Sequence, residues 1–187
     1  MRFRVKANTP DTMDDFLTFF EQRAFRDNPQ WAGCYCLYSY HNDEEWEASN
    51  PSENKTEALV RLAEGRMPGY LGYLDGEVIA WMAVGKRKNF NRYATYLADS
   101  EDTEKSIFSI TCFIIDPDFR NQGIATALLE RVSADLATKG VDILEAYPMD
   151  KEASNAHHHR GPLSLYKHAG FKVVEQVGIF ARVRKQL

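Results

Sequence analysis

The segment of residues 106–139 constrains the fold of this chain more than any other. Residues 106–115 form a dense apolar and β-branched run that ends at Asp116-Pro117, and this composition predicts a buried central strand. Residues 122–139 carry apolar side chains at helical spacing, so they predict an amphipathic helix, with Gly140 as its stop. A buried strand, a short turn and a helix are therefore expected in succession.

The turn before this helix reads Arg120-Asn121-Gln122-Gly123-Ile124-Ala125. A glycine and a small residue at this place let a diphosphate approach main-chain amides at the positive end of the helix dipole. The turn is therefore predicted to bind a phosphate group. It is not a P-loop, because no Gly-Lys-Ser/Thr follows, and it lacks the spaced glycines of a dinucleotide-binding fingerprint.

Elsewhere the chain alternates predicted strands and helices. The clearest hairpin turns at Asp75-Gly76, a dipeptide that favours positive φ angles. Residues 41–57 hold six acidic residues and are expected to form an irregular, exposed excursion, with Asn54 and Glu57 as a capping box for the next helix. The predicted strands are 2–7, 70–74, 77–84, 141–147, 171–174 and 178–183, and the remaining predicted helices are 11–25, 54–66 and 162–169.

The composition is that of an ordinary soluble globular protein, with 44% hydrophobic and 27% charged residues among 187. Its 23 Lys and Arg against 27 Asp and Glu give a net charge of −4, which argues against a nucleic-acid partner. No apolar run approaches the length of a membrane span, and the charged first residues do not resemble a signal peptide. Together with three sparse cysteines, this predicts a cytoplasmic protein with no membrane partner.

These features resemble the GCN5-related N-acetyltransferase (GNAT) family, whose phosphate loop reads Arg or Gln, two residues, Gly, one residue, then Gly or Ala. Residues 120–125 fit that spacing. The resemblance includes the preceding Cys112-Phe113-Ile114-Ile115-Asp116-Pro117 and the downstream Leu165-Tyr166-Lys167-His168-Ala169-Gly170-Phe171, which is similar to the family's late helix ending in Gly-Phe. It covers residues 106–171, which are 66 of the 187.

The resemblance implies a GNAT-like fold of the α/β class, with residues 1–187 as one N-acetyltransferase domain. We expect a mixed, mostly antiparallel sheet flanked by helices. Its central strands, 106–115 and 141–147, are expected to run parallel and to splay apart, so that acyl-CoA binds in the crevice between them.

The resemblance also implies acetyl-CoA as cosubstrate. Main-chain amides would hold the pyrophosphate at Gln122, Gly123, Ile124, Ala125 and Thr126, after Arg120. The backbone of Phe113, Ile114 and Ile115 would meet the pantetheine and the acetyl carbonyl. An amide aimed at the thioester oxygen helps most as that oxygen gains negative charge in the tetrahedral transition state. The side chains of Phe113 and Ile115 themselves are expected to be core residues.

Tyr166 matches the tyrosine that protonates the departing coenzyme A thiolate in many family members. A phenol with a pKa near 10 is protonated at neutral pH, so it can serve as this acid. The alternative is an aromatic side chain that packs its helix against the sheet.

Glu145 lies in the middle of a predicted buried strand, where an unpaired carboxylate would be costly. One interpretation is a general base or substrate anchor, because the attacking amine must lose a proton. The other is a structural carboxylate that faces water or pairs with a basic side chain.

No metal is expected. His157-His158-His159 is more simply a solvated loop than a metal site, and Cys34, Cys36 and Cys112 are expected to be free thiols. One departure from the family concerns an asparagine that many members carry soon after the second central strand. Asn155 lies too far upstream for its role to be transferred.

The predicted function is transfer of an acetyl group from acetyl-CoA to a primary amine of a small molecule or peptide, by direct attack. The alternative is a noncatalytic acyl-CoA-binding regulatory module, and a second rival is a thiol or metal module. If the acidic region 41–57 borders the acceptor cleft, its field would attract cationic amines. The oligomeric state is left open, a homodimer included.

Overall fold

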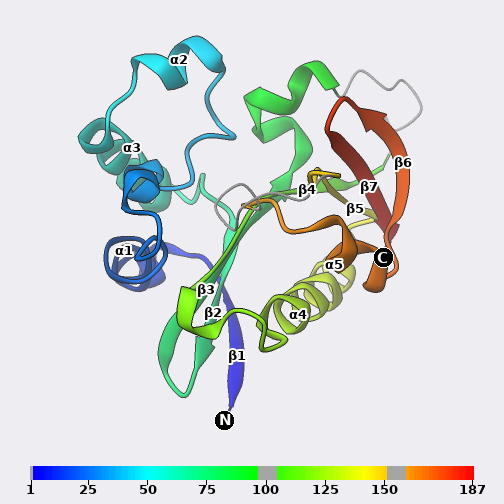
Figure 1. Ribbon diagram of the computed structural model, residues 1–187, viewed down its shortest axis with the longest axis horizontal. Helices are drawn as coiled ribbons and strands as arrows, with labels where there is room; N and C mark the ends of the chain where they lie inside the picture. The colour runs from blue at the N-terminus through cyan, green and yellow to red at the C-terminus, as the bar shows by residue number, and fades with distance from the viewer. Residues whose placement is uncertain (1, 97–104, 151–158) are drawn as a thin grey trace.

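A computed structural model describes residues 2–96, 105–150 and 159–187. One seven-stranded sheet runs through the molecule in the order β1-β2-β3-β4-β5-β7-β6 (Figure 1). Only β4 and β5 pair in parallel, and every other neighbouring pair is antiparallel. The strands are β1 (Phe3–Ala7), β2 (Gly69–Leu74), β3 (Glu77–Lys86), β4 (Ile107–Ile115), β5 (Ile143–Ala146), β6 (Lys172–Val177) and β7 (Phe180–Gln186). The expected mixed α/β fold is confirmed.

Helices cover both faces of this sheet. On one side lie α1 (Met13–Gln22), α2 (Asp43–Ala48) and α3 (Pro51–Ala63), and on the other lie α4 (Ile124–Thr138) and α5 (Leu163–His168) (Figure 1). Each side has its own apolar core, because the alternating side chains of a strand point to opposite faces. No helix in the described parts of the chain is both long and apolar enough to cross a membrane.

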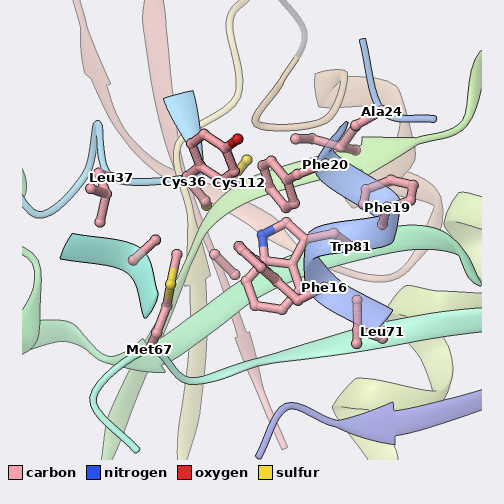
Figure 2. Packing of buried hydrophobic residues seen from close by; sticks show 14 of the residues in the cluster. Phe16, Phe19, Phe20, Ala24, Cys36, Leu37, Met67, Leu71, Trp81 and Cys112 are labelled. Carbon is pink, nitrogen blue, oxygen red and sulfur yellow. The ribbon is translucent and has the colours of Figure 1, made fainter. Parts of the chain in front are cut away.

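The core under α1 is built from aromatic rings. Trp81 of β3 is fully buried and meets Phe16 edge to face, with ring centroids 5.0 Å apart (Figure 2). Phe16 in turn stacks on Phe20 at 4.4 Å. Aromatic pairs of this kind add stabilisation beyond their buried area, so they fix α1 firmly against the centre of the sheet.

The central parallel strands separate as the sequence predicts. Pairing between β4 and β5 runs from Ile107 with Ile143 to Ile110 with Ala146. Beyond this point β5 ends, whereas β4 continues to Ile115, still paired with β3. An irregularity in the β3–β4 register falls next to Thr111, where the separation begins. The second half of β4 therefore has an open edge.

Two local predictions are corrected. Residues 41–57 are largely helical, not irregular, because Asn42 with Glu45 and Asn50 with Glu53 each form a capping box. Asn50 thus starts α3 four residues before the predicted cap, with Pro51 at the first helical position, where its missing N–H costs nothing.

The late strands are also longer than predicted. β6 runs to Val177 and β7 runs to Gln186, with their turn around Gly178 at φ +60°. The prediction placed Gly178 inside a strand, but a residue with this left-handed backbone belongs to the turn between strands.

Candidate active site

The N-terminus of α4 has the geometry expected of an anion site. Gly123 caps the helix with φ +79°, a left-handed conformation that favours glycine, and no side chain caps it. The first helical bond runs from the amide of Ala127 to the carbonyl of Gly123, at 3.0 Å. The amides of Ile124, Ala125 and Thr126 therefore have no partner within the helix and lie at its positive end.

A cavity of about 460 Å³ opens onto this helix end. It extends between the α4 N-terminus and the open edge of β4. Its lining includes eight of the nine residues predicted to bind coenzyme A: Phe113, Ile114, Ile115, Arg120, Gly123, Ile124, Ala125 and Thr126. The ninth, Gln122, turns its side-chain amide back to the carbonyl of Asp118, at 2.8 Å. The fold thus brings residues of the strand and of the loop to one cavity.

Arg120 is held at the mouth of this cavity by an acid. Its guanidinium pairs with both carboxylate oxygens of Asp27, and its Nε donates to the carbonyl of Ile115 at 3.1 Å. The hydrogen bond from Arg120 lowers the pKa of Asp27, so this carboxylate is charged at neutral pH. Asp27 also lines the cavity, which places a negative charge close to the predicted diphosphate site.

The main-chain groups of β4 alternate between its two edges. The amide of Asp116 donates to Ile79 at 2.9 Å, so by alternation Ile114 is also directed to β3, whereas Phe113 and Ile115 face the open edge. The amide of Phe113 donates to the carbonyl of His159 at 2.5 Å. The segment that leads from His159 into α5, orange in Figure 1, therefore lies against this edge.

A second cavity, of about 570 Å³, lies beside the first. The two share Phe25, Ile114 and His159 in their linings, so they meet at β4. The second cavity is walled by the aromatic side chains Trp31, Tyr38, Trp46 and Phe180, with Arg160 as its charged residue.

No Asp or Glu of the described ranges lines this second cavity. The acidic region 41–57 contributes Trp46, Ser49, Pro51 and Asn54 to the wall, none of them an acid. Region 41–57 therefore borders this cavity through uncharged side chains, and the expectation that its field attracts cationic amines stays a prediction.

Tyr166 lies directly behind the wall of the first cavity. Its side chain is fully buried, and its hydroxyl donates to the carbonyl of Arg160 at 2.6 Å. Burial raises the pKa of Tyr166, so the phenol stays protonated. A Cβ on Gly161, which lines that cavity, would lie 3.1 Å from the phenolic oxygen. The hydroxyl is thus separated from the cavity by the backbone of one residue.

Glu145 is engaged on both carboxylate oxygens. Its side chain is completely buried, accepts a hydrogen bond from Tyr147 and another from Arg184 Nε at 2.6 Å, and lies 3.8 Å from Arg87. Burial and this neighbouring carboxylate raise the pKa of Tyr147. Glu145 is absent from the linings of both cavities. The geometry therefore favours the second interpretation, a structural carboxylate that pairs with a basic side chain.

The thiols do not form a reactive centre. Burial raises the pKa of Cys34 to about 12, and a hydrogen bond with Cys36, together with burial, raises the pKa of Cys112. All three are free thiols, and the raised pKa values keep Cys34 and Cys112 protonated at neutral pH. Residues 2–96, 105–150 and 159–187 hold no group of three metal-ligating side chains. His157, His158 and Asn155 lie outside the described residues.

Two residues of the site were not singled out by sequence reasoning. His159 ends a histidine run in the sequence, and in the structure it lines both cavities and lies 5.9 Å from Trp31 and 6.0 Å from Tyr38, ring centroid to ring centroid. Arg160, next to it, lines the second cavity. The available signal was their position shortly before the Gly161-Pro162 start of a predicted helix.

Comparison with known proteins assigns the class. The family model described as acetyltransferase (GNAT) domain matches residues 66–173, more than half of the chain. The chain therefore belongs to the GNAT acetyltransferase family, as the sequence resemblance predicted, and the protein is an acetyl-CoA-dependent acyltransferase.

Solved structures of the same fold extend over nearly the whole chain. PaiA N-acetyltransferase from Thermoplasma acidophilum, solved in complex with coenzyme A, is 14% identical with a TM-score of 0.58, and the match covers 100% of both chains. The GNAT domain of S. lividans PAT is 18% identical with a TM-score of 0.61, covering 99% of this chain and 90% of that one. An acetyltransferase from Thermus thermophilus is 15% identical with a TM-score of 0.58, covering 100% and 98%. No curated protein matches the chain.

Proposed function

We propose that the protein transfers an acetyl group from acetyl-CoA to a primary amine of a small molecule or peptide. The observation that carries the proposal is the pair of cavities that meet at Phe25, Ile114 and His159. One cavity ends at an uncapped helix N-terminus suited to a diphosphate, and the other offers an apolar space for an acceptor. Coenzyme A in the related PaiA structure supports the first assignment for this chain.

In this mechanism the amides of Ile124, Ala125 and Thr126 hold the pyrophosphate, and the open edge of β4 aligns the pantetheine. The acetyl group then lies where the two cavities meet. A neutral amine in the second cavity attacks the thioester carbonyl, an N–C bond forms, and the C–S bond breaks as the thiolate leaves. An amide of the β4 edge stabilises the negative charge on the carbonyl oxygen during this step.

Two protons must move during the reaction. His159 is positioned to accept the proton of the amine, because it lines both cavities and an imidazole is the side chain that most often serves as a general base. Tyr166 stays the candidate acid for the thiolate, since its protonated hydroxyl lies just behind Gly161 of the cavity wall, where it donates to the carbonyl of Arg160. Glu145 can act as a base only if it leaves Arg184 and Tyr147.

The test combines binding and turnover. Calorimetry should show that acetyl-CoA binds with about 1:1 stoichiometry, and thiol release with a panel of amino acids, polyamines, aminoglycosides and peptides should identify the acceptor. His159→Gln should lower kcat while acetyl-CoA affinity stays within a few-fold. Binding without turnover of any amine would instead support the noncatalytic acyl-CoA-binding module.

A further inference from the structure

The second cavity is lined by a buried cation that forms no ion pair with any described acid. Arg160 is only 7% exposed, and its Nε has no hydrogen-bond partner. Within the described parts of the chain its guanidinium makes no ion pair; its contacts are with the rings of Phe180 at 4.4 Å, Tyr93 at 5.5 Å and Tyr38 at 6.0 Å. A buried cation held only by aromatic faces is costly unless an anion joins it.

Two acids line a smaller cavity together with Arg160, and both are engaged by other arginines. A smaller cavity of about 250 Å³ shares Arg160 with the second cavity and is also lined by Asp43 and Glu175. Asp43 pairs with Arg92, and Glu175 pairs with Arg182 at 2.8 Å. Neither of these two carboxylates therefore forms an ion pair with Arg160.

Hydrogen bonds hold the backbone on both sides of the Arg160 side chain. The carbonyl of His159 accepts from the amide of Phe113 at 2.5 Å, and the carbonyl of Arg160 accepts from the Tyr166 hydroxyl at 2.6 Å. The guanidinium is thus presented from a segment anchored to β4 and to α5. The planar guanidinium fork itself matches the two oxygens of a carboxylate.

We infer that the acceptor of this enzyme carries a carboxylate, which Arg160 binds, on an apolar or aromatic body that the second cavity encloses. The aromatic walls Trp31, Tyr38, Trp46 and Phe180 suit that body. The same geometry disfavours a polycation, because its second charge would meet Arg160 with no acid of residues 2–96, 105–150 and 159–187 on the cavity wall to offset it. The inference rests on the proposed function and names the acceptor class for it.

The test measures binding, so it does not depend on finding the natural acceptor. Calorimetry is carried out on the protein saturated with coenzyme A, using 3-phenylpropionate, indole-3-propionate and hexanoate, each against its primary amide. At least one acid should bind about 10-fold more tightly than its amide. Arg160→Gln should remove this difference and Arg160→Lys should retain part of it, while the affinity for coenzyme A is unchanged. Arg131→Gln, an exposed arginine on α4, is the matched control and should behave like wild type.

Equal binding of each acid and its amide, no binding of any of them, or a preference that survives in Arg160→Gln would overturn the inference. The proposed function fails separately, if coenzyme A itself does not bind. Turnover of amines that lack a carboxylate, with no preference for those that have one, would leave acetyl transfer standing and remove Arg160 as the residue that selects the acceptor.

Discussion

The amide of Phe113 and the carbonyl of His159 are joined by a hydrogen bond of 2.5 Å across the gap between the splayed strands. The segment before α5 thus engages one of the two amides that the second half of β4 directs to its open edge, and the amide of Ile115 is the other. In the proposed mechanism the pantetheine runs along this edge and therefore lies beside the amide of Phe113.

We therefore predict that acetyl-CoA perturbs the amide of Phe113 strongly. In a ¹⁵N-labelled protein its resonance should shift more than that of Asp116, whose amide donates to Ile79 at 2.9 Å toward β3 and serves as the internal control. Equal, small shifts at both amides would show that pantetheine does not run along this edge.

The glycine at the start of α4 should be essential for coenzyme A binding. Gly123→Ala places a Cβ on a backbone at φ +79°, which costs about 1–2 kcal/mol and distorts the amides that follow. We expect a lower Tm and a Kd for coenzyme A raised 10-fold or more, measured by thermal unfolding and calorimetry.

Gly140→Ala is the matched control, since Gly140 has φ +74° just beyond the other end of the same helix and equally open surroundings. It should lower Tm by a similar amount and leave the Kd unchanged. Parallel loss of coenzyme A affinity in both variants would mean that general destabilisation, not the phosphate site, is responsible.

Asp27 should weaken the binding of coenzyme A in the wild-type protein. Arg120 lowers the pKa of Asp27, so the carboxylate is charged at pH 7, lines the cavity and competes with a phosphate for the guanidinium. Asp27→Asn should tighten the Kd for coenzyme A by about 2–5-fold at low salt, the size typical of one partly exposed charge, and the gain should shrink as ionic strength rises. Glu64→Gln, which removes an exposed acid paired with Arg66, should have no effect. A weaker Kd in Asp27→Asn would indicate that Asp27 is needed to orient Arg120.

Tyr166→Phe separates the acid role from a structural one. Loss of the hydrogen bond to Arg160 should cost about 1 kcal/mol of unfolding free energy in either case. If Tyr166 protonates the thiolate, kcat should fall at least 10-fold with little change in KM for acetyl-CoA. Tyr35→Phe removes a phenolic hydrogen bond to Glu21 and should lower stability alone. An unchanged kcat in Tyr166→Phe would exclude the acid role. Tyr166 would then serve only to pack α5 and to hold the carbonyl of Arg160.

Glu145→Gln should affect stability far more than chemistry. Removing one charge from a buried pair leaves Arg184 partly uncompensated, so we expect a loss of roughly 3 kcal/mol in urea unfolding. The kcat of the folded fraction should stay within a few-fold of wild type. A stable variant with no activity would restore the role of base or substrate anchor.

The parts of this protein that follow from local sequence were predictable. The buried run of β4, the hairpin at Asp75-Gly76 and the glycine start of α4 depend on neighbouring residues, because backbone preferences and apolar periodicity act over a few positions. The loop and the strand that form the coenzyme A cavity could therefore be named in advance.

Only the tertiary structure decided which residues meet from distant parts of the chain. Arg184 neutralises Glu145 from 39 positions away, Asp27 reaches Arg120 from 93, and Arg160 enters an aromatic cavity built from other segments. Such contacts depend on how strands order themselves in the sheet and on which charges are left without partners after packing. The spacing of residues along the sequence does not reveal which distant residues pair. The enclosure of Arg160 by aromatic rings became visible only in the folded structure.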